Sequence, residues 1–230
     1  MRAPHLSKRS LITGLTVAAM AMASTVALSI NATPSQAASC NGYVGLTFDD
    51  GPSAGNTQAL LTALKQYGLK ATLFNIGQNA AANPSLVKSE VNAGMWVGNH
   101  SYTHSHMDSM TQSQMKSDLS QAQSAITAGG APAPTLFRPP YGEHNSTLDS
   151  VAASLGLKVI TWDIDSQDWN GASESAIVQA NARLQNGQII LMHEWVANTR
   201  AAIPQIASGL ASRNLCPGKI SSQTGRAVAP

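Results

Sequence analysis

Two adjacent carboxylates, Asp49 and Asp50, follow an apolar run at residues 43–48 that the pattern predicts to be a strand. Side chains of neighbouring strand residues point to different sides, so the two acids can serve one site in different roles. Unpaired carboxylates repel each other, which makes the pair costly unless a cation or an arginine lies between them. Alone, the run could be an ordinary turn rich in Asp and Gly. Polar residues follow apolar runs in the same way four more times downstream, which favours a site.

Two histidines, His100 and His104, stand at positions i and i+4. On a helical turn they would share one face and could chelate a single metal ion. Asp50 as third ligand would leave one coordination position open for water, as expected of a catalytic zinc-like site. Taken alone, a histidine pair at this spacing is often chance or packing. His106 would face away from the other two on a helix and is expected at the surface or behind the ligands.

A stiff loop surrounds Arg138, because two prolines and Gly142 follow it closely. A buried arginine beside Asp49 would pair with that carboxylate and orient it. A purely structural salt bridge would involve nearly the same contact. The backbone N–H of Tyr141 could face a substrate oxygen as an oxyanion donor.

His193 ends the apolar run at residues 189–192 and could act as a general acid. A lone histidine there could equally be a satisfied core residue. Asp168 is the candidate carboxylate that would raise the pKa of His193. Trp169 and Leu191 would wall the pocket, although a single tryptophan more often belongs to a core.

Short apolar runs alternate with longer amphipathic ones through the rest of the chain. Strands are predicted at residues 43–48, 71–76, 95–98, 135–137, 158–162 and 188–192. Helices are predicted at residues 57–67, 83–93, 111–127, 146–155, 173–184 and 198–210. This alternation predicts one α/β domain with a parallel sheet, either a barrel or an open doubly wound sheet.

Every candidate residue follows the C-terminal end of a predicted strand, where parallel α/β folds place their active sites. A barrel gathers all of these ends around one mouth. The sequence therefore favours a (β/α) barrel over an open sheet.

Residues 1–37 are predicted to be a cleaved secretory signal peptide, which leaves residues 38–230 as the mature domain. Three basic residues precede an apolar stretch at residues 11–30, and a small-residue cleavage site ends at Ala37. A retained membrane anchor is the alternative, because the stretch is long enough to span a bilayer.

Removal of these three basic residues changes the balance from 14 Lys and Arg against 12 Asp and Glu to 11 against 12. A nearly neutral protein gives no electrostatic case for binding nucleic acid or an anionic membrane. The composition suits an extracellular protein that meets a neutral partner, and we expect a monomer.

Cys40 and Cys216 are the two cysteines of the chain. In an oxidising compartment an even pair predicts a disulfide, and two buried free thiols are the alternative. The bridge would close a loop of about 175 residues, which the loop-entropy estimate values at no more than about 4–5 kcal/mol.

Five motifs together resemble those of the polysaccharide deacetylases of carbohydrate esterase family 4, the NodB-homology domain. In the family's order they are Thr47-Phe48-Asp49-Asp50-Gly51, His100-Ser101-Tyr102-Thr103-His104, Arg138-Pro139-Pro140-Tyr141-Gly142, Asp165-Ser166-Gln167-Asp168-Trp169 and Leu191-Met192-His193. The resemblance covers about residues 43–196 and implies a distorted (β/α) barrel. Within the family the chain is most similar to secreted acetyl-xylan esterases of actinobacteria, including the cysteine pair and residues 221–230.

This resemblance implies that Asp50, His100 and His104 bind a divalent metal, zinc or cobalt. Glu194 stands where an Asp more often follows the motif's histidine, and we expect a small effect because the charge is kept. His144 is a loop residue that could touch substrate.

The same resemblance implies roles for five further residues. Asp49 would be the base that takes a proton from the attacking water, and Arg138 would orient it. The amide of Tyr141, together with the metal, would stabilise the oxyanion. His193, tuned by Asp168, would protonate the leaving group.

The implied function is a secreted, metal-dependent hydrolase that removes acetyl groups from acetylated xylan, a neutral polysaccharide. The alternative substrate is an N-acetylglucosamine polymer, either chitin-like or peptidoglycan. A carbohydrate-binding protein on a degenerate scaffold should have lost a ligand or the base, and none is missing. A serine esterase, which would use a nucleophile elbow of the form Gly-x-Ser-x-Gly, is a third alternative and is not favoured.

Overall fold

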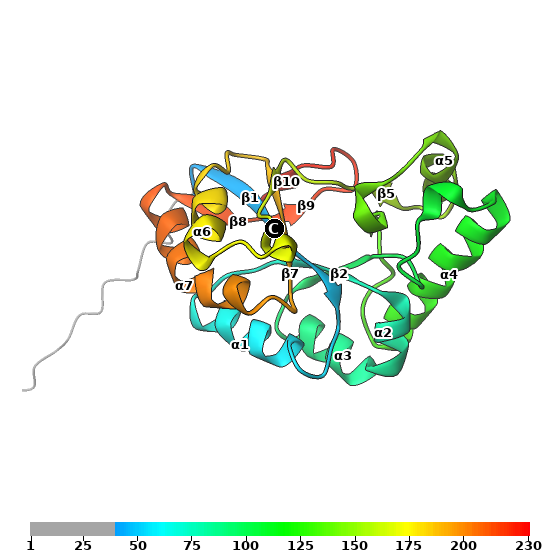
Figure 1. Ribbon diagram of the computed structural model, residues 1–230, viewed down its shortest axis with the longest axis horizontal. Helices are drawn as coiled ribbons and strands as arrows, with labels where there is room; N and C mark the ends of the chain where they lie inside the picture. The colour runs from blue at the N-terminus through cyan, green and yellow to red at the C-terminus, as the bar shows by residue number, and fades with distance from the viewer. Residues whose placement is uncertain (1–39) are drawn as a thin grey trace, which may run out of the picture. The chain divides into compact units, whose positions relative to one another are not determined.

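A curved sheet of parallel strands forms the centre of the computed structural model, which describes residues 40–230 (Figure 1). The strand order is β5-β4-β3-β2-β1-β7-β6, and β8 pairs with the start of β1. These strands are β1 Gly42–Gly51, β2 Thr72–Asn75, β3 Trp96–Asn99, β4 Leu136–Phe137, β5 Lys158–Val159, β6 Ile164–Asp165, β7 Ile189–His193 and β8 Leu215–Pro217. No pairing among the described residues joins β5 to β6, so the curled sheet forms a half-barrel and does not close into a full one. The distorted barrel expected from the sequence is confirmed.

Helices surround this sheet (Figure 1). They are α1 Thr57–Gln66, α2 Gly77–Ala82, α3 Pro84–Asn92, α4 Gln112–Ala128, α5 Ser146–Ser154, α6 Glu174–Ala182 and α7 Ala197–Ser212. In the view of Figure 1, α1 and α3 lie along the lower side, α6 and α7 at the left, and α4 and α5 at the right. The six predicted helices agree with the structure to within two residues at each end, whereas α2 was not predicted.

The central strand β1 presents different chemistry to its two sides because side chains alternate along a strand. Val44, Leu46 and Phe48 pack in a cluster with apolar residues of the outer helices. Thr47 and Asp49 point to the other side, where the guanidinium of Arg138 contacts both. The strand is longer than predicted and includes both acidic residues, with a register shift against β2 between Asp49 and Gly51.

A disulfide between Cys40 and Cys216 fixes the start of β1 beside β8, which confirms the predicted pair. The chain then forms a small antiparallel pair, β9 (Lys219–Ile220) with β10 (Ala227–Val228). The sequence did not predict these two strands, nor β6 and β8.

The predicted signal peptide lies outside the described residues. Within residues 40–230, no helix is both long and apolar enough to cross a membrane.

Candidate active site

The C-terminal ends of the strands meet at a pocket of about 340 Å³. In the sheet register, Asp49 of β1 lies directly beside His193 of β7. The pocket is lined by Asp49, Asp50, His100, His104, Pro139, Tyr141, Trp162, Asp165, Trp169, Leu191, His193 and Trp195. Two further candidates, Arg138 and Asp168, lie buried behind the lining and contact Asp49 and His193 respectively. The structure thus gathers the candidates from separate segments around one mouth.

Asp50, His100 and His104 form a group of donor atoms suited to one metal ion. Oδ1 of Asp50 lies 3.5 Å from Nε2 of His100 and 3.3 Å from Nε2 of His104. Donors bound to a tetrahedral zinc ion are separated by roughly 3.3 Å, so the spacing fits. Oδ1 is buried and has no hydrogen-bond partner, which is costly for a carboxylate oxygen unless a cation is bound there. The donor set therefore fits a divalent metal.

Hydrogen bonding fixes the tautomer of His100. Its Nδ1 lies 2.7 Å from the carbonyl oxygen of Arg138, and a carbonyl can only accept. Nδ1 therefore carries the hydrogen, and Nε2 presents its lone pair to the donor set. Burial and the neighbouring imidazole of His100 lower the pKa of His104, outweighing nearby carboxylates, which favours the neutral imidazole that metal binding requires.

Electrostatics favour the ionised form of Asp50. Burial acts to raise the pKa of this carboxyl. The nearby imidazoles of His100 and His193 and the N–H of Trp195 together hold it well below its usual range. Asp50 itself has a φ of 73°, in the left-handed region that is uncommon for a residue other than glycine. That local conformation turns its carboxylate toward the two imidazoles.

The two histidines converge without the helical turn that their spacing suggested. Residues 100–105 are irregular, and both Ser101 and His104 have left-handed backbones, with φ of 62° and 55°. The hydroxyl of Ser101 accepts a hydrogen bond from the His104 amide at 2.8 Å. The expectation of a shared helical face was therefore wrong, although the metal-ligating pair it proposed does lie together.

Asp118 of α4 shapes this loop and was not recognised from the sequence. Its carboxylate accepts hydrogen bonds from the amides of Tyr102 at 2.6 Å and Thr103 at 3.2 Å, and from the Thr103 hydroxyl at 2.8 Å. The signal was present, because Asp118 interrupts the buried face of α4 between Met115 and Ala122. A carboxylate in that position must find donors.

Arg138 is fully buried and pairs with Asp49. Its Nη1 donates to Oδ1 of Asp49 at 2.8 Å and to the hydroxyl of Thr47 at 2.7 Å. Its Nη2 donates to the carbonyl of Thr161, and the guanidinium carbon lies 4.2 Å from the ring centroid of Phe74. Burial lowers the pKa of Arg138, but the Asp49 carboxylate opposes this. The predicted contact is therefore present, and it leaves Oδ2 of Asp49 on the side of His100, at 3.8 Å from its Nε2.

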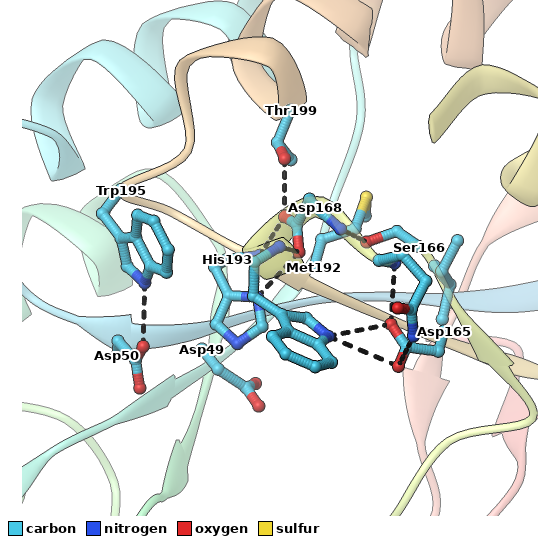
Figure 2. A network of polar contacts seen from close by, with 12 residues as sticks. Asp49, Asp50, Asp165, Ser166, Asp168, Met192, His193, Trp195 and Thr199 are labelled. Atoms are coloured by element: carbon cyan, nitrogen blue, oxygen red, sulfur yellow. Dashed lines mark hydrogen bonds and ion pairs between the residues drawn. The ribbon is translucent and has the colours of Figure 1, made fainter. Parts of the chain in front are cut away.

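The imidazole of His193 is held in place by contacts with Asp168 (Figure 2). Nδ1 of His193 lies 2.8 Å from Oδ1 of Asp168, whose Oδ2 accepts from the His193 amide and the Thr199 hydroxyl. Burial acts to lower the pKa of His193, but the Asp168 hydrogen bond and the nearby carboxylates outweigh it and raise the value. The pKa of Asp168 is lowered: burial opposes ionisation, and its hydrogen bond and ion pair with His193 prevail.

Tyr141 occupies a strained position at the rim, with a φ of 60°. Its ring stacks on His106 at 4.2 Å between centroids, and Nδ1 of His106 lies 2.6 Å from Oε2 of Glu143. His106 is thus a surface residue that supports the Tyr141 loop. His144 pairs with Asp149 of α5 and does not line the pocket.

Three exposed aromatic side chains border the pocket. Tyr141 is 55% exposed, Trp169 50% and Trp195 46%. Leu191 is buried in β7 and adds an apolar patch to the wall. The predicted wall of Trp169 and Leu191 is therefore part of the lining. Trp195 was not predicted, because it lies beyond the last recognised motif.

A buried acidic network lies beneath the Asp49–Gly51 segment. Asn75 of β2 donates through Nδ2 to Oε2 of Glu90 at 2.7 Å, and Glu90 is fully buried. Glu194 is also buried and accepts from the Thr57 hydroxyl at 3.0 Å. A Cβ on Gly51 would lie 2.7 Å from Oε2 of Glu194 and 3.0 Å from Oδ1 of Asn75, so a larger residue would force these buried side chains to shift.

Burial and the charge of Glu194 raise the pKa of Glu90 to about 8, against the Asn75 hydrogen bond. Because the folded value exceeds the unfolded 4.5, the unfolded chain loses its proton first as pH rises. We therefore expect Glu90→Gln to gain stability relative to the wild type between about pH 4.5 and 8, by at most about 1.4 kcal/mol per pH unit. Denaturant unfolding across that range measures this, with Glu174→Gln at the start of α6 as control. A pH-independent difference would contradict it.

The segment Gly51-Pro52-Ser53-Ala54-Gly55 has the form of a nucleophile elbow, so the motif alone is compatible with a serine esterase. The geometry decides instead. The Ser53 hydroxyl accepts from Nδ2 of Asn56 at 3.0 Å, and the Ser53 amide donates to Thr57. Among the described residues, no histidine is hydrogen-bonded to Ser53, and Ser53 does not line the pocket. A Ser-His pair is therefore not formed.

The known proteins that this chain matches are consistent with the arrangement of the site described above. A family model described as polysaccharide deacetylase matches residues 37–160. The chain is 55% identical over 193 residues to a bifunctional xylanase/xylan deacetylase of Cellvibrio japonicus, covering 83% of this chain and 29% of that protein. It is 34% identical over 177 residues to a peptidoglycan-N-acetylglucosamine deacetylase of Listeria monocytogenes, covering 76% and 37%. The chain therefore belongs to the polysaccharide deacetylase family.

Among solved structures, the family 4 carbohydrate esterase from Streptomyces lividans in complex with acetate is similar to this protein. The TM-score is 0.82 at 65% identity, and the match covers 83% of this chain and 99% of that one. The curated relatives are longer, since the chain spans only 29% and 37% of the two named above. The resemblance inferred from the five motifs is confirmed.

Proposed function

We propose that this protein is a secreted, metal-dependent hydrolase that removes acetyl groups from acetylated xylan. One observation carries the proposal. The Asp50, His100 and His104 donors lie in one pocket between a carboxylate oriented by Arg138 and an imidazole oriented by Asp168.

Asp50, His100 and His104 would hold the metal, zinc or cobalt. A bound divalent metal polarises a carbonyl oxygen and makes water more acidic. The buried, unpaired Oδ1 of Asp50 and the outward lone pair of His100 support this assignment.

The residues of the chain account for the proton transfers. Arg138 fixes one oxygen of Asp49, which leaves the other to accept a proton from the attacking water. Asp168 holds Nδ1 of His193, so Nε2 can donate a proton to the departing sugar oxygen. The backbone N–H of Tyr141 would face the acetyl carbonyl oxygen. Water and the acetyl ester become acetate and a free hydroxyl, with no covalent acyl-enzyme.

Further observations support the proposed substrate and the proposed secretion of the protein. The Cellvibrio japonicus relative is a xylanase/xylan deacetylase by name, and three exposed aromatic rings border the pocket, as suits a sugar polymer. The disulfide and the apolar N-terminal stretch support secretion, with residues 38–230 as the mature, monomeric domain.

The proposal is tested by assaying the purified protein on acetylated xylan and on N-acetylated chitin oligosaccharides. We expect acetate release from xylan, loss of activity with a chelator, and recovery when Zn²⁺ or Co²⁺ is added back. Faster release from the chitin oligosaccharides would favour the amide substrate, the alternative that the Listeria relative supports. Activity insensitive to exhaustive chelation would reject metal dependence.

The Asp168→Asn variant should shift the pH profile. Asparagine can still accept from Nδ1 of His193, but it removes a charge that raises the pKa of His193. Activity that depends on protonated His193 should then fall at a lower pH on the alkaline side than in the wild type. The measurement is kcat against pH. Asp163→Asn is the control, because the carboxylate of Asp163 pairs with Arg226 and not with His193. An unchanged alkaline limb would refute the acid role.

A further inference from the structure

The two carboxylate oxygens of Asp50 have different surroundings. Oδ1 is buried, lacks a hydrogen-bond partner and lies within 3.5 Å of both imidazole Nε2 atoms. Oδ2 accepts a hydrogen bond from Nε1 of Trp195 at 2.8 Å (Figure 2). The indole nitrogen therefore contacts the oxygen that does not lie against the histidines.

We propose that Trp195 is a positioning residue for the metal, holding Oδ2 of Asp50 so that Oδ1 alone serves as ligand. This inference rests on the metal-dependent function proposed above. A carboxylate can bind a metal through one oxygen or both, and a donor on one oxygen favours the other. The indole N–H suits this role because it only donates and cannot itself become a ligand.

Burial of the indole does not explain its position, because Trp195 is 46% exposed. The position is explained instead by Glu194, the residue before Trp195, which is held in place by hydrogen bonds. The Glu194 amide donates to the carbonyl of Asp49 at 3.3 Å, and the buried Glu194 carboxylate accepts from Thr57. The segment after β7 is thus tied to β1 and α1, and the indole reaches from it to Asp50.

Trp195 also lies beside His193, the proposed general acid. Its ring centroid is 5.6 Å from that of His193, and both rings line the pocket. One indole therefore contacts a candidate ligand through its edge and borders the substrate space with its ring. Trp169 offers a natural comparison, because its Nε1 lies 3.3 Å from Oδ1 of Asp165, which is not in the donor set.

The test compares Trp195→Phe with Trp169→Phe in metal binding. Each variant and the wild type are stripped with a chelator and titrated with Zn²⁺ against a competing indicator, and Co²⁺ absorption spectra report the ligand geometry. We expect the dissociation constant of Trp195→Phe to rise about 10–100-fold with an altered Co²⁺ spectrum. Trp169→Phe should match the wild type in both measurements.

Wild-type affinity and spectrum in a folded Trp195→Phe would overturn the proposal for Trp195 while leaving the metal site intact. A wild type that binds neither ion would instead reject the metal site, so the two failures are distinguishable. Site-specific replacement of Trp195 by benzothienylalanine removes only the N–H and keeps the fused ring. It should weaken binding as phenylalanine does, and unchanged binding would count against the hydrogen bond even if Trp195→Phe failed to fold.

Discussion

The Asp49→Asn variant is expected to lose about 10²–10⁴-fold in kcat on acetylated xylan while still binding metal. Asparagine keeps the shape of the side chain and can accept from Nη1 of Arg138. It cannot take a proton from water. The loss should therefore appear in kcat, with a smaller change in KM, because the substituted group acts on the reacting water.

Measuring the bound metal distinguishes the loss of the base from damage to the metal site. We expect Asp49→Asn to retain stoichiometric Zn²⁺, since Asp49 is not one of the three donors. Asp50→Asn is the matched comparison, because it should lose both metal and activity. Activity near that of the wild type in metal-loaded Asp49→Asn, or in Asp49→Ala, would refute the base assignment.

The Arg138→Met variant is expected to destabilise the fold by about 3–5 kcal/mol in denaturant unfolding. Methionine fills part of the volume but leaves the buried Asp49 carboxylate without its cation, and the Thr161 carbonyl without its donor. Activity should fall as well, because the orientation of Asp49 is lost.

A double-mutant cycle tests the cause. Asp49→Asn combined with Arg138→Met removes both charges, so the double variant should lose less stability than the two single losses added together. Arg226→Met is the control, since Arg226 pairs with Asp163 near the surface and should change stability by about 0–1 kcal/mol. Additive losses would show that Arg138 stabilises the fold through its other contacts.

Much of the site could be predicted because its residues follow periodic elements. Asp49, Arg138 and His193 come directly after or at the end of recognisable strands, and parallel strands bring these ends to one edge. The alternation of apolar and amphipathic runs predicted an α/β domain with a parallel sheet, and the candidate residues at the strand ends favoured the barrel. Local pattern and global fold agree in these segments.

The connecting segments could not be predicted in the same way. The 100–105 loop takes its shape from Asp118, which is remote in the sequence, so the histidine spacing alone suggested a helix that does not form. Helix α2 begins at Gly77, which looks like a helix breaker. A Cβ there would lie 2.4 Å from the Tyr102 ring and 2.7 Å from Ala122, so packing rather than helix propensity selects the glycine.

Gly51 illustrates how a residue without a side chain can govern chemistry. A methyl group there would displace the buried side chains of Glu194 and Asn75, which lie against the backbone of Gly51. In a saturation-mutagenesis screen for activity, this position should score as indispensable alongside Asp49 and Asp50, although it can neither bind a metal nor move a proton. Loss of activity in such a screen would here reflect the close packing around Gly51. Only metal binding and pH profiles would distinguish Gly51 from the residues that take part in the reaction.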